Sequence, residues 1–495
     1  MAEIRITFTG LIAVATGMIT AIIGIIFTLI ITRMLDPVEF GTWGVISVIF
    51  LSVLQIEPII SYWTTREISR GLDSAKTAIL ASTILSSIGI VIFLLIAYVM
   101  GNKTDTDFQI LFFASFLIPL IFLNKVLLGI NLGWKPHAVS YGLLVFSIVQ
   151  IPMALIFVYY FNLGVYGILF SVGIAYVSSI IVYVITAWEK IKKDFQIKFL
   201  KKWFKFSWLP FYPGVAGMIY SYDVIIFSLF VGTVEGIAFW TVAILLPSIV
   251  SHSGLISTAV YPKLLKYGKM DHLQRNITQI FYFGFPLSAI VIVFAQPGLF
   301  ALNPIYQIVF PVVIIMTIQT FLNTLSTVFQ AILRGVETVD MDENNGFKKY
   351  IKSKLFFLPT LLIIQYSIYI SSLTVMLWFA SSTSSQIELL VYWSLILLIT
   401  QIPFTTYHFL MVRKKMQISL EYYKLLKYFV LSIIIFSFTY YLMEQFLEFN
   451  ENIFVFIPNV LFFVLIGISG YICISYLIDD RTKQLVLEII HEIRK

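Results

Sequence analysis

The chain has 495 residues, of which 59% are apolar and 12% are charged, and its formal net charge is +7. A soluble globular domain carries roughly 25% charged residues, so this composition excludes an ordinary soluble protein and predicts a membrane protein. The basic residues flank apolar runs, where anionic lipid headgroups attract them, so the charge does not call for a nucleic-acid partner. The one cysteine, Cys473, excludes a disulfide or a cysteine-based metal site within the chain.

Apolar runs of membrane-spanning length recur along the whole sequence. Crossing a hydrocarbon core of about 30 Å takes roughly 20 apolar residues in a helix, because unpaired backbone groups are costly in lipid. The sequence therefore predicts an all-α, polytopic membrane protein with about 14 transmembrane helices. The expected spans lie near 10–32, 41–60, 78–100, 110–130, 140–161, 163–186, 207–231, 236–259, 278–300, 305–333, 355–379, 387–411, 425–443 and 453–478. The first run lacks a cleavage site, so we expect it to stay as a helix rather than act as a signal peptide.

The distribution of basic residues predicts the orientation. Loops numbered alternately from the N-terminus place 30 of the 33 Lys and Arg residues on one side. Arg33 and Lys103 lie on the other side, and Lys125 lies within a span. Because cytoplasmic loops collect Lys and Arg, we expect a multi-pass cell-membrane protein with cytoplasmic N- and C-termini. A missed span would have mixed the two sides, so the sorting also favours fourteen spans.

The longest basic connection separates six spans from the rest. Its apolar residues recur at intervals of three or four, with lysines between them: Trp188, Ile191, Phe195, Phe199, Trp203 and Phe206. This pattern predicts an amphipathic helix in the inner headgroup layer, with a merely solvated basic loop as the alternative. The predicted parts are a six-helix bundle over 1–187, a linker over 188–206, a second six-helix bundle over 207–411, and spans 13 and 14 with a cytoplasmic tail over 412–495.

The two bundles resemble each other as repeats. At an offset of 196, VEFGTWGVIS from Val38 aligns with VEGIAFWTVA from Val234, which places Glu39 on Glu235. The same offset places the basic segment at Thr64 over that at Val260. Because six is an even number, both bundles start on the same side, and the predicted repeat is parallel, with its axis along the membrane normal.

Two short motifs accompany the layout of six, six and two spans. The first span ends in an Arg-x-Leu-x-Pro-x-x-Phe/Tyr-Gly pattern, and the seventh carries an aspartate before Gly-x-x-x-Gly. The residues are Arg33, Leu35, Pro37, Phe40 and Gly41, then Asp223, Gly232 and Gly236. With these motifs the chain resembles the polysaccharide-transport branch of the multidrug/oligosaccharidyl-lipid/polysaccharide exporter superfamily. It departs from the pattern at Asp36, where many relatives have glycine. We expect Asp36 and Pro37 to turn the chain and Gly41 to let the next helix start close to its neighbour.

The resemblance implies a flippase for a polyprenyl-(pyro)phosphate-linked oligosaccharide, which moves from the cytoplasmic to the outer leaflet by alternating access. It implies no nucleotide hydrolysis, no enzyme activity and no bound cofactor, although a coupling ion, H⁺ or Na⁺, is compatible with it. Other membrane proteins of glycan assembly are expected partners. By analogy, spans 13 and 14 border a groove for the lipid tail.

Charges within the spans are the first candidates for the substrate or ion path, because ionisable groups are costly in a membrane. Asp223 lies deep in span 7, with Tyr220 on the same helical face and Tyr222 beside it. It either faces the cavity, with a part in ion coupling, or bonds a neighbouring helix. Lys125 either binds the lipid phosphate or extends its long side chain to the interface. For Glu57, interfacial exposure is the favoured interpretation.

Arg33 and Arg66, at opposite faces of the membrane, are further candidates. Either arginine could hold a phosphate through two parallel hydrogen bonds, or serve as a plain headgroup anchor. Asp105-Thr-Asp107 and Asp340-Met-Asp342 mimic a metal-binding Asp-x-Asp motif, but no soluble domain accompanies them. The five histidines show no ligand spacing, so no metal site is expected.

Two other functions compete with the flippase. An ion-coupled multidrug or small-molecule exporter of the same superfamily fits Asp223 and the tyrosines, but fits Lys125 and the two extra spans less well. A membrane-embedded glycan polymerase or glycosyltransferase commonly needs a large external loop. The longest predicted external loops have about nine residues, near 101–109 and 444–452, which argues against such an enzyme.

Overall fold

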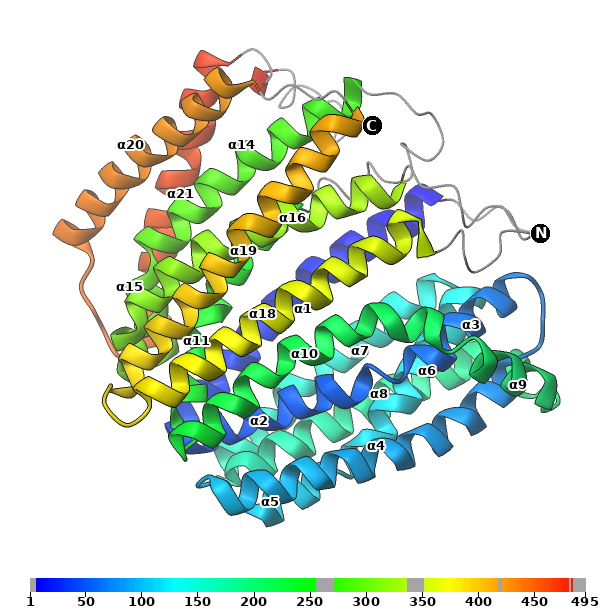
Figure 1. The fold of residues 1–495 in the computed structure, drawn as a ribbon. Helices are drawn as coiled ribbons and strands as arrows, with labels where there is room; N and C mark the ends of the chain where they lie inside the picture. The colour runs from blue at the N-terminus through cyan, green and yellow to red at the C-terminus, as the bar shows by residue number, and fades with distance from the viewer. Residues whose placement is uncertain (1–5, 255–270, 336–350, 417–420, 480–481, 484–495) are drawn as a thin grey trace. The chain divides into compact units, whose positions relative to one another are not determined.

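The computed structural model describes residues 6–254, 271–335, 351–416, 421–479 and 482–483 (Figure 1). All regular elements in this part of the chain are helices, which confirms the all-α prediction. The first are α1 (Ile6–Met34), α2 (Pro37–Leu54), α3 (Pro58–Ser69), α4 (Ala75–Lys103), α5 (Phe108–Ala114), α6 (Leu117–Trp134), α7 (His137–Ala154), the π-helical η1 (Leu155–Tyr160), α8 (Gly164–Ile191), α9 (Ile197–Lys205) and α10 (Trp208–Val231). The others are α11 (Glu235–Leu245), the 3₁₀ turn η2 (Pro247–Gly254), α14 (Asp271–Val293), α15 (Ala295–Leu302), the 3₁₀ turn η3 (Pro304–Val309), α16 (Phe310–Gly335), α18 (Lys354–Ala380), α19 (Gln386–Met416), α20 (Tyr422–Phe446) and α21 (Ile453–Ile478). The predicted basic segment at Val260 and the Asp340-Met-Asp342 motif lie outside the described residues.

Within the described ranges, 11 helices are long and apolar enough to cross a membrane, or up to 13 if each of two bent pairs is one span. The bent pairs are Glu235–Leu245 with Pro247–Gly254, at 41°, and Ile277–Val293 with Ala295–Leu302, at 60°. The first predicted span corresponds to α1, of which Ile22–Met34 counts as a shorter apolar helix. The multi-span architecture is confirmed, whereas the number fourteen stays a prediction.

Contacts along the chain divide it into two compact units. Unit 1 comprises Met1–Phe239 and Leu362–Gln386, and unit 2 comprises Trp240–Leu361 and Ile387–Lys495. The chain passes from one unit to the other within α11, within α18 and at the start of α19, so the units differ from the bundles 1–187 and 207–411 that the repeat predicts. Those bundles stay a prediction. The starts of α5 and η3 lie 196 residues apart, which is the offset of the predicted repeat.

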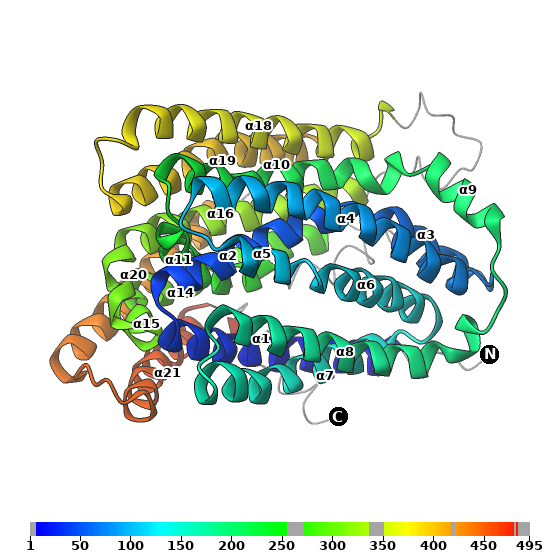
Figure 2. The same ribbon diagram turned by 90° about the horizontal axis from the view of Figure 1, so that it is seen from below.

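In unit 1, the turn after α1 forms as the sequence predicts. Asp36 caps α2, because its carboxylate accepts a hydrogen bond from the Glu39 amide at 2.8 Å, and Pro37 occupies the first helical position. A glycine has no side chain to make this bond, so the departure from the family pattern supplies a helix cap. Unit 1 continues with α7 and α8, which run side by side (Figure 2).

The two glycines of the second motif end one helix and start the next. Gly232 closes α10 in the left-handed conformation, with φ of +79°. The α10–α11 turn then meets the start of α2, since a Cβ on Gly41 would lie 1.9 Å from the carbonyl oxygen of Val234. Asp105, in the loop after α4, accepts hydrogen bonds from the Val234 amide at 2.9 Å and the Thr233 hydroxyl at 2.5 Å. Gly41 therefore allows the close approach that the sequence predicts.

The linker differs from its prediction. The structure has two helices where one amphipathic helix was expected over Trp188 to Phe206, because α8 continues to Ile191 and α9 covers only Ile197–Lys205. The chain bends between them, and the Gln196 amide donates to the Thr77 hydroxyl at 2.9 Å. This bond fixes the linker to α4 and interrupts the expected continuous apolar face.

In unit 2, a proline explains how the last two helices attach. Pro286 lies inside α14 and has no amide hydrogen, so it leaves the carbonyl of Tyr282, four residues earlier, without its helical donor. The Tyr471 hydroxyl of α21 donates to that carbonyl at 3.0 Å. Beside it, the Tyr428 hydroxyl of α20 donates to the Asp479 carboxylate at 2.8 Å. Buried hydroxyl groups thus join α14, α20 and α21.

Candidate functional site

Asp223 lies in the buried middle of α10 within unit 1, and 3% of its surface is exposed. Its Oδ2 accepts a hydrogen bond from the Tyr369 hydroxyl of α18 at 2.8 Å. Its Oδ1 accepts from the Val224 amide at 2.7 Å. The carboxylate therefore has the bond to a neighbouring helix that the sequence offered as one alternative, and any role in ion coupling stays a prediction.

Aromatic rings surround this carboxylate. The ring of Tyr220 lies 5.1 Å from that of Tyr366 and 5.9 Å from that of Tyr369, between centroids. Tyr222 is instead exposed (37%), so only one of the two predicted tyrosines joins the cluster. The sequence did not identify Tyr366 and Tyr369, because they lie more than 140 residues from Asp223. Their spacing of three residues on one face of α18 was the available signal.

Glu57 occupies the break between α2 and α3. Only 4% of it is exposed, so the interfacial exposure that the sequence favoured is wrong. Its Oε2 accepts a hydrogen bond from the Ser61 hydroxyl at 2.9 Å, and its Oε1 has no hydrogen-bond partner among the described residues. The physical reason is that Pro58 starts a new helix, α3, directly after Glu57, and α3 packs against α6 instead of leaving Glu57 at a free chain end.

Lys125 lies beside Glu57 because α3 and α6 pack along matching stripes. Ser61 and Thr65 of α3 face Gly129 and Gly133 of α6, and one turn earlier Glu57, just before α3, faces Lys125. The Thr65 hydroxyl donates to the Gly129 carbonyl at 2.9 Å, and a Cβ on Gly133 would lie 2.7 Å from the Thr65 carbonyl oxygen. The glycines let the helices approach closely. Lys125 is exposed and near enough for electrostatic interaction with Glu57.

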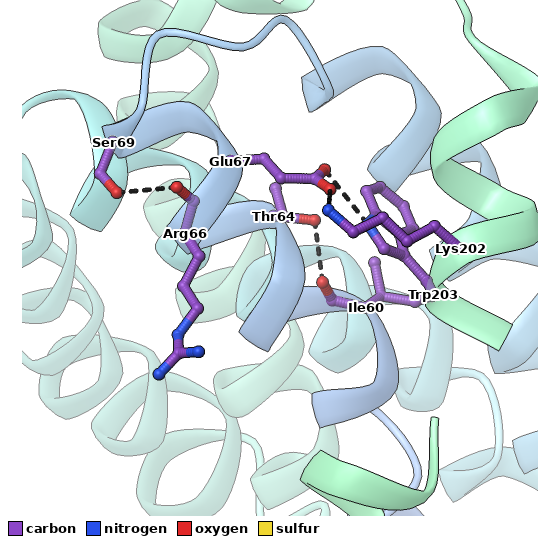
Figure 3. A network of polar contacts seen from close by, with 7 residues as sticks. All are labelled: Ile60, Thr64, Arg66, Glu67, Ser69, Lys202 and Trp203. Atoms are coloured by element: carbon purple, nitrogen blue, oxygen red, sulfur yellow. Dashed lines mark hydrogen bonds and ion pairs between the residues drawn. The ribbon is translucent and has the colours of Figure 1, made fainter. Parts of the chain in front are cut away.

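The two arginine candidates lie near helix ends. Arg33 is half-buried in the last turn of α1. Arg66 is exposed in the last turn of α3, and its guanidinium carbon lies 4.5 Å from the centroid of the Tyr62 ring. Figure 3 shows Arg66 pointing away from Glu67, which bonds Lys202 and Trp203 instead. A phosphate-binding role for either arginine stays a prediction.

A buried polar line in unit 2 was not predicted. His408 of α19 is completely buried, and its Nδ1 lies 2.9 Å from the Ser326 hydroxyl of α16. Gln330 bonds Ser326 at 3.4 Å, and Arg334 donates to Gln330 at 3.3 Å. The three α16 residues are four positions apart and therefore lie on one face of the helix, and this spacing was the available signal in the sequence. No group of three or more His, Cys, Asp or Glu side chains in the described ranges could hold a metal ion.

Comparisons with known proteins agree with this architecture. No protein-family model and no curated protein matches the chain significantly. Among solved structures, the lipid II flippase MurJ in an inward closed conformation matches with a TM-score of 0.67 and 15% identity, over 96% of this chain and 99% of that one. An inward-facing multidrug resistance transporter of the MATE family matches with a TM-score of 0.61 and 14% identity, over 80% of this chain and 95% of that one.

The chain has the fold of transporters of the MOP superfamily. A further match of this fold is a MOP superfamily transporter from Pyrococcus furiosus, with a TM-score of 0.51 and 14% identity, over 84% of this chain and 95% of that one. The superfamily-level resemblance seen in the sequence motifs is thus confirmed at the level of the fold.

Proposed function

We propose that this protein is a flippase that moves a polyprenyl-(pyro)phosphate-linked oligosaccharide from the cytoplasmic to the outer leaflet by alternating access. The observation that carries this proposal is the extent of the structural matches. The lipid flippase covers 96% of the chain, whereas the MATE transporters cover 80–84%. At 84% coverage about 79 residues of this chain have no counterpart in the MATE match, whereas at 96% coverage only about 20 have none in the lipid flippase.

The chemistry of the substrate explains why such a fold is needed. Each hydroxyl of a sugar chain costs on the order of a few kcal/mol if it is buried without a partner, so the glycan needs a polar path across the membrane. The polyprenyl tail is apolar and can remain in lipid. Unit 2 has an apolar groove where α20 begins against α14, lined by Phe285, Tyr422, Tyr423, Leu425, Leu426 and Phe429. In this proposal the groove accommodates part of the tail.

The charges predicted from the sequence receive roles in this proposal. Lys125 binds the lipid phosphate, and its position beside Glu57 gives the ammonium group an acidic neighbour when the phosphate has left. Arg33 and Arg66 receive the phosphate near the two ends of the path. Asp223 senses the coupling ion, H⁺ or Na⁺. The protein is proposed to lie in the cell membrane with cytoplasmic termini, near other glycan-assembly proteins.

One observation favours a second candidate function, ion-coupled export of organic cations. Asp223 lies among Tyr220, Tyr366 and Tyr369, and a carboxylate among aromatic rings suits a cation. The match to a multidrug resistance transporter agrees with it. The third candidate, a glycan polymerase or glycosyltransferase, gains no support from the matches, which are to transporters and a flippase.

The test is leaflet access in proteoliposomes. A labelled lipid-linked oligosaccharide in the inner leaflet becomes reachable from outside if the wild-type protein flips it, and stays protected in empty vesicles. We expect Asp223→Asn and Lys125→Ala to lose this activity while remaining folded, and the exposed Lys76→Ala control to keep it. If the lipid never crosses but an organic cation is expelled against an ion gradient, the exporter replaces the flippase.

A further inference from the structure

The helix α9 presents three distinct surfaces within nine residues, two apolar and one basic. At about 100° per residue, Phe199 and Trp203 fall on one side. Ile197 and Phe204, seven residues apart, fall on a second, and the lysines 198, 201 and 205 follow one another on a third. The helix contains no Asp or Glu. The burial of these residues shows that only the first surface is occupied by the protein itself.

The occupied surface fixes α9 to α3 in unit 1. Phe199 and Trp203 are 5% and 0% exposed. The Trp203 indole and the Lys202 ammonium both bond the Glu67 carboxylate, at 3.1 and 3.0 Å, and Glu67 is only 2% exposed (Figure 3). Because a buried carboxylate with two donors is costly to separate from them, α9 is held in a fixed orientation.

The other two surfaces are open. Ile197 is 57% exposed and Phe204 is 49% exposed, and both are large apolar side chains. Lys198, Lys201 and Lys205 are exposed beside them. An apolar stripe next to a basic stripe is the pattern of a helix that lies in a bilayer interface, with its apolar side chains in the acyl boundary and its lysines among the headgroups.

The position of α9 in the chain brings it to a membrane surface. The chain leaves one candidate span at Ile191 and enters the next at Trp208, so both ends of α9 are tethered close to span ends. We propose that the open surface of α9, formed by Ile197, Phe204 and the three lysines, binds the anionic phospholipid headgroups of the adjoining leaflet. The charge complementarity selects anionic over zwitterionic lipid. This inference is independent of the transported substrate.

The test measures the depth of α9 in bilayers of defined composition. A spin label at Ile197→Cys, in a Cys473→Ser background, is placed in the full-length protein and reconstituted with phosphatidylcholine alone or with phosphatidylglycerol. Collisions with oxygen report lipid contact, and collisions with a water-soluble nickel chelate report water contact. Each lysine near an anionic surface contributes roughly a five-fold preference for anionic over zwitterionic lipid. Removing three lysines therefore reduces this lipid preference on the order of 100-fold.

We expect the label to contact lipid with phosphatidylglycerol, and to shift toward water in the K198Q/K201Q/K205Q variant and at high salt. The matched control R413Q/K414Q/K415Q removes three exposed cations from the end of α19 and leaves the label in place. Equal depth in both lipids and in the lysine variant overturns the anionic-lipid site, because apolar anchoring then suffices. Water contact in every bilayer overturns it as well, and leaves the basic stripe to an acidic protein or nucleic acid.

Discussion

Two variants at the hydrogen bond between Tyr369 and Asp223 distinguish a structural role of the aspartate from a role in transport. Tyr369→Phe keeps the ring beside Tyr220 and removes only the hydroxyl that donates to Oδ2 at 2.8 Å. Asp223→Asn keeps an oxygen that can accept this bond and removes the charge. A hydrogen bond to a buried charged group contributes about 1.5–3 kcal/mol, and the Val224 amide leaves the carboxylate only partly satisfied once the hydroxyl is gone.

We expect Tyr369→Phe to lower the free energy of unfolding by about 1.5–3 kcal/mol in thermal or denaturant unfolding of the purified protein. Tyr366→Phe on the same helix is the control, because no hydrogen bond from its hydroxyl to Asp223 is seen in the structure. If Asp223 lies on the ion path, Asp223→Asn abolishes flipping per folded molecule, whereas Tyr369→Phe retains it within a few-fold.

Two results would refute this reasoning. Stability of Tyr369→Phe within about 0.5 kcal/mol of wild type would mean that the bond has no energetic weight. Flipping by Asp223→Asn that falls only with the amount of folded protein would mean that the charge is structural. The double variant Asp223→Asn/Tyr369→Phe then tests whether the two side chains stabilise the fold through one bond. If they do, the effects of the single variants on the free energy of unfolding are not additive.

Three further predictions concern helix packing and a loop. Tyr471→Phe leaves the proline-freed carbonyl of α14 unpaired and should cost about 1–3 kcal/mol in thermal unfolding. Gly41→Ala should destabilise by about 1–3 kcal/mol through overpacking, whereas Gly24→Ala, with open space around it, should not. The hydrogen bond from Lys190 lowers the pKa of Asp73, which lies in the loop between α3 and α4. The stabilisation of this loop by the bond is therefore present above about pH 4 and is lost as the pH falls further. Hydrogen exchange of the loop measured against pH should show this dependence, and Lys190→Gln should abolish the dependence.

Local features of the sequence predicted local structure well. Asp36 and Pro37 turn the chain, and Gly41 allows the close approach, as their chemistry predicts; the cap that Asp36 makes is a finding of the structure. Asp223 could be recognised from its depth in an apolar run, and Tyr220 from helical spacing. In each case the deciding interaction lies within a few residues or depends on a property of the residue itself.

Features that depend on distant segments were not predictable in the same way. The partner of Asp223 is Tyr369, whose separation of 146 residues no periodicity reveals. Glu57 was placed at the interface because it lies near the end of an apolar run, but α3 extends beyond it and buries it. The sequence predicts one helix for the linker because the hydrophobic period continues through Phe195. In the structure the helix is interrupted there, and the Gln196 amide donates to the Thr77 hydroxyl of α4.

The attachment of α20 and α21 shows how two helices can be added to a membrane fold. Lipid tails are as apolar as the helices, so burial in lipid supplies little drive for helix association, and close packing and polar contacts must supply it. Pro286 frees the Tyr282 carbonyl on α14, and a hydroxyl from Tyr471 is the partner that reaches it. An apolar side chain at 471 could pack against α14 but could not satisfy that carbonyl. The proline and the tyrosine therefore act together: Pro286 leaves a carbonyl of α14 without a helical donor, and the position of that carbonyl specifies where α20 and α21 pack on α14.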